Sequence, residues 1–259
     1  MYSSALTQEL GTDDSTRLFT DARRKLAINN GLETFTDLTE CAIRQTTVTC
    51  SNGVAEYNLN STVNIPGGDF LRLASQGPEY HHTNPSSQIT YVAGPDSFPR
   101  RDIPWLNQYE PGWRSSTGGT PTAYYERRDG GQYLLGLVPP PGIQTSATAQ
   151  IVVPYVAKPA VLTSDTDVPF TYGSTVRTDL TLYHQAAVHY GAYELEKLRL
   201  NTEASQAQLA QFHGYVERYT RARIPKGGQQ MRMGRNYFAE VKGRRGADVE
   251  QTVPYPWRT

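Results

Sequence analysis

The chain has 259 residues, with 25 basic and 25 acidic side chains, so its formal net charge is zero. A chain of this length can bury a substantial core, and its neutral balance excludes a whole-molecule electrostatic attraction to nucleic acid or acidic membrane. Hydrophobic content is low at 37%, while tyrosine alone accounts for 17 residues. Tyrosine combines a large contact area with a polar tip, so these residues suit half-exposed sheet positions and protein interfaces equally well.

Cysteine usage and hydropathy indicate the compartment. Cys41 and Cys50 lack a CxxC partner, and one pair does not make a disulfide framework, so we expect free thiols in a reducing environment. The N-terminus lacks a charged start followed by an apolar run, and no stretch approaches the ~20 apolar residues of a membrane span. These features predict a protein that is made in a cytosol and stays soluble or assembles there.

A helical pattern begins the chain. Leu18, Phe19 and Leu26 belong to one apolar stripe at helical spacing. The run Asn29-Asn30-Gly31 is a typical helix stop, because glycine tolerates the left-handed conformation that ends helices. We therefore predict a helix over about residues 14–29, with the three apolar residues on its core face.

Residues 39–59 predict a first β-hairpin. The segment 39–50 is rich in threonine, and 54–59 alternates as a returning strand after the turn Ser51-Asn52-Gly53. Residues 60–112 hold many Pro, Gly, Ser and Asn residues. Within them we predict a strand at 89–92 and long loops elsewhere.

The stretch 113–163 has the pattern of a compact antiparallel β unit. Its hairpin arms are 122–127 and 132–138, and a further strand covers 147–156. The run Pro139-Pro140-Pro141-Gly142 is interpreted as a stiff bend between strands. The residues expected to pack the β unit are Trp113, Tyr124, Tyr125, Leu135, Leu137, Val153 and Tyr155.

Two amphipathic helical patterns follow, at 174–200 and 202–223. The short break at Asn201-Thr202 predicts an antiparallel helical hairpin, with the N-terminal helix as the third member of a bundle. The bundle core expected from these patterns comprises Leu180, Tyr183, Ala187, Leu195, Leu209, Phe212 and Val216, together with Leu18, Phe19 and Leu26.

The predicted fold class is α+β. It combines a small helical bundle, an inserted antiparallel β domain and an extended C-terminal tail. The expected division is an N-terminal arm and helix at 1–35, the β domain at 36–172, the helical hairpin at 173–223 and the tail at 224–259.

The tail has no sustained helical or strand period. It carries seven basic and three acidic residues, a net charge of +4, and it is rich in aromatic residues and methionine. A purely solvating tail is poor in aromatic residues, so we expect this one to dock on a partner. The docking residues predicted are Met231, Arg232, Arg235, Tyr237, Phe238, Lys242, Arg244, Arg245, Tyr255 and Trp257.

No motif in the chain predicts catalysis. His184 and His189 are five residues apart, which does not fit a helical zinc pair, and the sequence after Gly118-Gly119-Thr120 lacks the lysine of a phosphate loop. Asp165 with Asp167 or Glu110 is a weak carboxylate pair for a glycosidase. We expect no catalytic, metal or cofactor-binding residues, and we expect that the protein is not an enzyme.

The order of these segments resembles the adaptor (head–tail connector) proteins of tailed bacteriophages. The resemblance covers about residues 14–222 and is strongest over 119–169, which contains Gly119-Thr120-Pro121-Thr122-Ala123-Tyr124-Tyr125 and Leu162-Thr163-Ser164-Asp165-Thr166-Asp167. The large β insertion makes the chain more like the larger neck proteins than the almost wholly helical smallest adaptors.

The resemblance implies a structural virion protein in the neck between capsid and tail, assembled in the host cytoplasm. It implies a ring of twelve copies beneath the portal, with the C-terminal segment reaching into the portal. From their length alone, we expect the loops of 60–112 to reach neighbouring subunits. A tail tube, stopper or nozzle protein lies below, and passing double-stranded DNA is contacted transiently and without specificity. Alternatives are another neck or tail component, such as a tube-proximal or nozzle ring, a cell-wall hydrolase acting at entry, and a DNA-binding module.

Scattered arginine pairs, such as Arg100-Arg101, Arg127-Arg128 and Arg244-Arg245, give no single nucleic-acid stripe on one chain. In a ring, each pair would repeat around the axis and form a charged collar facing DNA.

Overall fold

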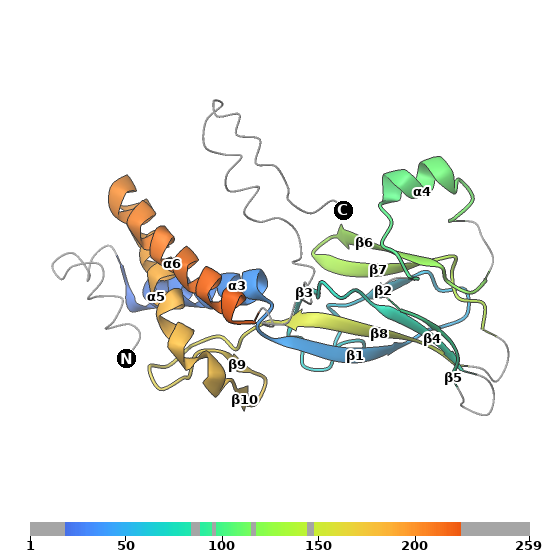
Figure 1. Ribbon diagram of the computed structural model, residues 1–259, viewed down its shortest axis with the longest axis horizontal. Helices are drawn as coiled ribbons and strands as arrows, with labels where there is room; N and C mark the ends of the chain where they lie inside the picture. The colour runs from blue at the N-terminus through green and yellow to red at the C-terminus, as the bar shows by residue number, and fades with distance from the viewer. Residues whose placement is uncertain (1–18, 84–88, 95–96, 115–117, 144–147, 224–259) are drawn as a thin grey trace, which may run out of the picture.

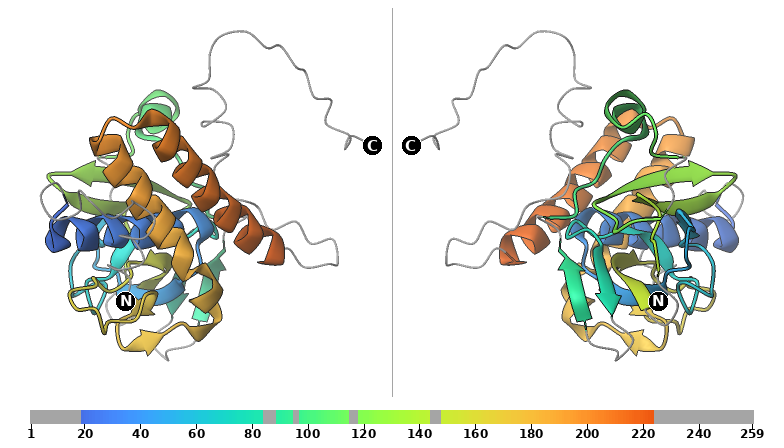
Figure 2. Two further views of the ribbon diagram at one scale, coloured as in Figure 1. Left: turned by 90° about the vertical axis from the view of Figure 1, so that its left-hand side faces the viewer. Right: turned by 90° about the vertical axis from the view of Figure 1, so that its right-hand side faces the viewer.

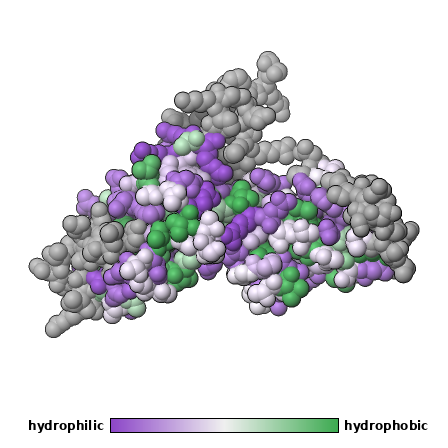
Figure 3. Space-filling model, turned by 90° about the horizontal axis from the view of Figure 1, so that it is seen from below, coloured by the Kyte–Doolittle hydropathy of each residue, from purple (hydrophilic) through white to green (hydrophobic). Residues whose placement is uncertain are grey.

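The computed structural model describes residues 19–83, 89–94, 97–114, 118–143 and 148–223. Three long helices lie at one end of an elongated molecule and the larger β-sheets lie at the other, as Figure 1 shows from the side and Figure 2 from each end. The fold class is therefore mixed α+β, as predicted. A face seen from below has apolar side chains scattered among polar ones over the described residues, instead of one continuous apolar patch (Figure 3).

Helix α3 (Asp21–Thr39) is longer than the sequence predicted. It begins after Thr20, whose hydroxyl accepts a hydrogen bond from the Arg23 amide at 3.4 Å, and it ends at Glu40, which has a left-handed φ of 48°. The predicted stop at Asn29-Asn30-Gly31 is wrong, because these residues lie inside the helix. A Cβ on Gly31 would lie 2.7 Å from the carbonyl oxygen of Ala187, so glycine here permits close packing of two helices.

Helices α5 (His184–Leu198) and α6 (Thr202–Arg223) follow a 3-10 turn at Thr178–Tyr183. The predicted helix from 174 starts later, because Thr175–Val176 forms the short strand β10, paired with β9 (Thr171–Tyr172). Helix α5 packs against both α3 and α6. The α6 boundaries agree with the sequence prediction.

The aromatic residue at the centre of this helical part is Phe35. Its ring centroid lies 5.3 Å from that of Phe170, 5.6 Å from Tyr183, 5.7 Å from Tyr219 and 6.4 Å from Phe212. Tilted and edge-on ring pairs at these distances add to the stabilisation from burial alone. One side chain of α3 therefore joins the 3-10 turn, α6 and the segment before β9.

The larger sheet has five antiparallel strands built around β8 (Thr148–Ala157). Strand β1 (Ile43–Thr49) pairs with one side of β8, and β3 (Phe70–Leu73) and β4 (Glu79–Thr83) pair in succession with the other. Strand β5 (Ile89–Ala93), expected from the sequence, pairs with β4 at the edge.

Pro154 explains where β3 gives way to β4 along β8. Its carbonyl oxygen accepts a hydrogen bond from the Ala74 amide at 3.0 Å, on the side of β8 that β3 and β4 share. The backbone nitrogen of Pro154, which carries no hydrogen, points to the same side. Proline is therefore tolerated in this central strand, because it lies opposite the break between the two partner strands.

The smaller sheet contains β2 (Glu56–Asn58), β7 (Gln132–Val138) and β6 (Ala123–Asp129) in that order. The β6–β7 hairpin is confirmed, and its turn is Gly130-Gly131, with φ values of 54° and 83°. The predicted hairpin between residues 39–50 and 54–59 is wrong, because β1 pairs with β8 and β2 pairs with β7.

The two sheets pack face to face. Phe70 on β3 contacts Tyr133 of the smaller sheet at 4.9 Å between ring centroids, and Phe98 contacts Tyr124 at 5.5 Å. Helix α4 (Ile103–Tyr109) covers the outer face of β6 and β7, where its Leu106 is buried. Among the described residues of 60–112, β5 agrees with the strand predicted at 89–92, whereas β3, β4 and α4 lie where long loops were predicted, which corrects that part of the prediction.

Candidate functional site

The C-terminal end of α3 is the point where the helices meet the sheets, and three arginine side chains converge on it. They are Arg72 from β3, Arg177 from the segment before the 3-10 turn, and Arg223 from the last residue of α6. Because the last carbonyls of a helix lack intrahelical partners and carry partial negative charge, cationic donors stabilise this end. We call these three residues the arginine clamp.

Arg72 binds both side chains and backbone of the helix end. It donates to the carboxylate and the carbonyl of Asp37, and its Nη1 donates to Glu40 Oε1 at 2.7 Å. Burial opposes its charged form, but the bonds to Glu40 and Asp37 outweigh this and raise its pKa. The hydroxyl of Ser75 donates to the second Glu40 oxygen at 2.7 Å. These bonds hold the backbone of Glu40 in a left-handed conformation that residues other than glycine rarely adopt.

Arg177 and Arg223 bind the carbonyls that follow. Arg177 Nη1 donates to Cys41 O at 2.8 Å, while Arg223 Nη1 donates to Glu40 O at 3.0 Å. A hydrogen bond to Asp179 raises the pKa of Arg177, and the same bond lowers that of Asp179. The Arg177 guanidinium therefore stays charged beside the helix end. The clamp also fixes the position of Arg223, the last described residue before 224–259.

Beneath the clamp lies a buried polar cluster around Tyr172. Its hydroxyl shares a hydrogen bond with Thr36 Oγ1 at 2.7 Å and lies 3.4 Å from Cys41 Sγ. Burial raises the pKa of Tyr172, so it stays a neutral phenol. Arg44 of β1 links strand β9, which contains Tyr172, to the larger sheet. Its guanidinium donates to the Tyr172 carbonyl at 2.5 Å and to the Asp69 carboxylate at 2.6 Å.

The outer face of the smaller sheet carries a second polar network, centred on Glu56. Its carboxylate accepts from Tyr125 Oη at 2.7 Å and from Arg127 Nη2 at 2.8 Å. Burial acts to raise the pKa of Glu56, but the bonds to Arg127 and Tyr125 outweigh it and lower the pKa. The Tyr125 ring lies over Gly136 of the neighbouring strand, where a Cβ would lie 2.0 Å from its ring carbons. Tyr125 is therefore a packing residue with a satisfied hydroxyl.

The predicted β-packing residues lie in two layers. Tyr124, Leu135, Leu137, Val153 and Tyr155 are buried between the sheets, whereas Trp113 and Tyr125 are buried on the α4 side. Burial raises the pKa values of Tyr124 and Tyr155 to about 12.

Seven of the ten predicted bundle-core residues are buried. Leu26 is 60% exposed, which corrects the prediction, because α3 turns Ala27, Ile28 and Gly31 toward α5 instead. Leu209 is partly buried against the core, and Leu18 lies outside the described residues. The buried members are Phe19, Leu180, Tyr183, Ala187, Leu195, Phe212 and Val216.

The predicted docking residues of the tail, from Met231 to Trp257, lie outside the described residues. Sequence reasoning missed the arginine clamp. In the sequence, Arg223 belongs only to Arg221-Arg223, one of the scattered basic clusters, and no local pattern marks Arg72 or Arg177, because their partners are distant in sequence.

Asp165 and Asp167, two of the weak carboxylate candidates, have partners that suit a structural role. Asp167 accepts the amides of Thr163 and Ser164 at 2.7 and 2.8 Å, and these bonds lower its pKa. Asp165 lies 3.7 Å from Lys25 of α3, whereas Glu110 follows α4 over the smaller sheet.

His189, Cys41 and Cys50 pack within the fold. His189 Nδ1 lies 2.7 Å from Gln208 Oε1, and Cys41 and Cys50 are buried free thiols. Within the described ranges, no group of three His, Cys, Asp or Glu residues is placed to hold a metal ion. None of the helices in that part of the chain is long and apolar enough to span a bilayer.

A comparison with known families decides the class of protein. The sequence pattern of the family described as SU10 adaptor protein matches residues 4–237, which is most of the chain. The chain belongs to the SU10 adaptor protein family. The resemblance to head–tail adaptors is thereby confirmed, and this adaptor is a structural protein of the bacteriophage virion neck. No curated protein matches the chain.

Proposed function

We propose that this adaptor forms a ring, of twelve copies, that joins the portal at the capsid vertex to the tail and lines the channel through which DNA passes. The observation that carries this proposal is the family match. It includes the helices, both sheets and the first part of the C-terminal segment, up to residue 237. A tail tube, stopper or nozzle protein is the partner expected on the other side of the ring.

Within the ring, we assign separate roles to the two ends of the molecule. The helices α3, α5 and α6 form a bundle that packs side by side with its neighbours, while the sheets form an inserted domain that faces outward. The domain division at 1–35, 36–172, 173–223 and 224–259 belongs to this proposal. The contacts of α5 with both α3 and α6 and the separate location of the sheets support such a division, but α3 runs to Thr39, so its last four residues lie past the first boundary.

The C-terminal segment is the part that docks on the portal in this proposal. Support comes from the clamp, because Arg223 holds the end of α6 against α3 and so gives the segment a fixed starting point. The segment carries a net charge of +4 and several aromatic residues, which can bury against a partner while the charges guide association.

Deleting residues 224–259 tests this assignment. The deletion leaves Arg223 and every described contact in place, so we expect an unchanged circular dichroism spectrum and melting temperature. Co-sedimentation with purified portal rings should be lost. A variant with Arg221→Gln serves as the matched control, because Arg221 is 77% exposed and its guanidinium bonds Glu217 in the same helix, at 3.0 Å. If the truncated protein still co-sediments with portal rings, the docking role of the tail is wrong.

A further inference from the structure

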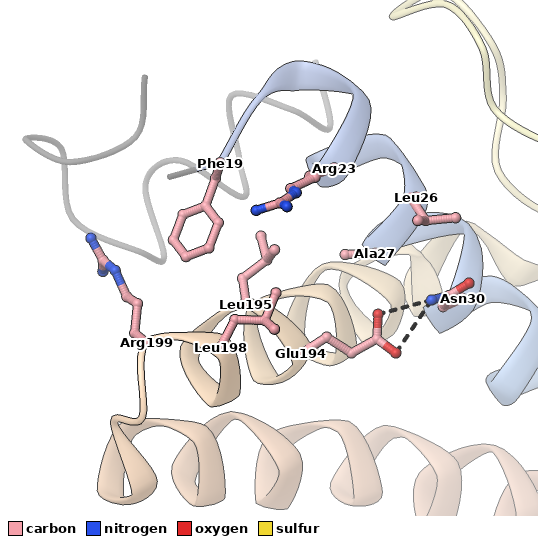
Figure 4. A pocket seen from close by; sticks show the side chains of 9 residues that line it. All are labelled: Phe19, Arg23, Leu26, Ala27, Asn30, Glu194, Leu195, Leu198 and Arg199. Carbon is pink, nitrogen blue, oxygen red and sulfur yellow. Dashed lines mark hydrogen bonds between the residues drawn. The ribbon is translucent and has the colours of Figure 1, made fainter. Parts of the chain in front are cut away.

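A groove lies between α3 and α5, at the end of the helical part far from the sheets. It has a volume of about 340 Å³ and is lined mainly by Phe19, Leu26, Leu195 and Leu198. Figure 4 shows Phe19, Leu195 and Leu198 facing the same space, with Leu26 farther along α3 and α6 on the other side of α5. Leu195 is buried, whereas Leu26 and Leu198 are 60% and 65% exposed. Two large leucine side chains therefore border this groove without cover from any described residue.

The rim of the groove is polar and ordered. Asn30 donates to both carboxylate oxygens of Glu194, at 3.0 and 3.3 Å. The guanidinium of Arg199 lies 5.2 Å from the ring centroid of Phe19, so a cation closes the opposite side. An apolar floor with a charged rim is the usual composition of a site for a peptide segment with apolar anchors.

We propose that residues 1–18 of the same chain occupy this groove, with Leu6 and Leu10 as the apolar anchors. Chain continuity is the first argument. Phe19 is both a residue of the groove wall and the first described residue, so the preceding segment starts at the site itself. A tethered segment has an effective concentration in the millimolar range, so modest contacts are enough to keep it docked.

The sequence of the segment fits the chemistry of the groove. Tyr2, Leu6 and Leu10 recur at four-residue intervals, so one helical face would carry all three. The segment has three acidic side chains and one basic one, which complements the Arg199 side of the rim. Leu10 is nine residues from Phe19, and a helical segment of that length spans about 14 Å, so reach is no obstacle.

A cysteine pair tests the contact. The variant Leu10→Cys with Leu198→Cys should form a disulfide within one chain under mild oxidation. Leu10→Cys with Leu182→Cys is the matched control, because Leu182 is 69% exposed but lies before the other end of α5. We expect the first pair to close at least about tenfold faster than the control, since docking raises the local thiol concentration. Native Cys41 and Cys50 are buried and do not interfere.

Equal closure rates for the two pairs would overturn the proposal. Disulfide-linked dimers on a non-reducing gel would also overturn it, because the occupant would then be the arm of a second copy. The assay uses the purified full chain without portal, so its failure would leave the proposed ring function untouched.

Hydrogen exchange gives a second measurement that does not depend on new thiols. Leu6→Ser with Leu10→Ser should speed amide exchange at residues 195–199 several-fold while leaving β8 unchanged. Thr7→Ala with Gln8→Ala is the control, since these positions lie off the apolar stripe, and it should exchange like the wild type. Unchanged exchange at the end of α5 in the leucine variant would contradict the docking of the arm.

Discussion

The helical and the β parts of this adaptor hold their cores together in different ways. In the helical part, one ring, that of Phe35, contacts Phe170, Tyr183, Phe212 and Tyr219. In the β part, burial is spread along β8, which pairs with three other strands, and along β7, which is buried on both faces. Helical packing in which one ring contacts four others is more sensitive to loss of that ring than packing that is distributed along paired strands.

The join between the two parts is polar as well as apolar. Arg72 of the clamp links the end of α3 to β3, while Tyr172 links Thr36 of α3 to Arg44 of β1, all through directed hydrogen bonds. Such bonds fix the relative placement of two parts, because each donor has only a narrow range of productive geometry. We therefore expect substitutions to affect local unfolding differently in the helical part and in the β part, while the orientation of the two parts stays fixed.

The largest effect is expected for Phe35→Ala. Removing a fully buried ring typically costs about 3–5 kcal/mol, because a cavity remains where the ring was. We expect amide protection to fall in α5 and α6 and to persist in β7 and β8, as measured by native-state hydrogen exchange. The matched variant is Phe98→Ala in the β part, which should show the reverse pattern. Equal loss of protection in both parts for either variant would mean that the two parts share one cooperative core.

The sequence predicted local structure better than it predicted long-range partners. The β6–β7 hairpin is encoded locally, since two glycines with positive φ separate two runs rich in tyrosine, leucine and valine. The turn at Gly53 is also real, with a φ of 72°, but its amide bonds Pro141 O at 2.8 Å. The strands on either side of it therefore enter different sheets, and no local pattern distinguishes this from a hairpin.

The candidate site was less predictable than the fold. Arg72 reaches Asp37 and Glu40, which are more than thirty residues away, and Arg177 reaches Cys41 across the whole β part. Charge alone does not specify a partner, because most surface arginines stay solvated. Only the tertiary fold brings the three guanidiniums to one helix end.

Two glycines in the helices should respond to the same substitution with opposite signs. At Gly31 an added methyl meets backbone atoms of Ala187 at 2.7 and 2.9 Å, so Gly31→Ala should destabilise by about 1–3 kcal/mol. At Gly214 in α6 nothing lies within 4 Å, so Gly214→Ala should stabilise by about 0.5–1 kcal/mol. Urea unfolding of both variants measures the difference. Stabilisation by Gly31→Ala would show that α3 and α5 can move apart without cost.

The smallest effect expected is a difference in acid sensitivity between the two parts. In the helical part, burial lowers the pKa values of His184 and His213 from 6.5, with Glu217 partly opposing this at His213. In the β part, the pKa of Glu56 is lowered from 4.5 by Arg127 and Tyr125, against the effect of burial. In all three cases the folded state binds fewer protons than the unfolded state. Their contributions to stability are complete above the ordinary pKa and are lost as the pH falls below it.

The helical part should therefore start to lose stability below about pH 6.5, and the β part only below about pH 4.5, by the same linkage. Glu194 acts in the opposite direction, because burial raises its pKa, so the comparison is best made in a Glu194→Gln background. Hydrogen exchange at pH values between these limits, corrected for intrinsic rates, should show weakened protection in α5 and α6 alone. His213→Gln should reduce that loss, and Glu56→Gln should leave it unchanged. A simultaneous loss in β7 at the same pH would contradict separate proton linkage, since Glu56 stays ionised throughout that range.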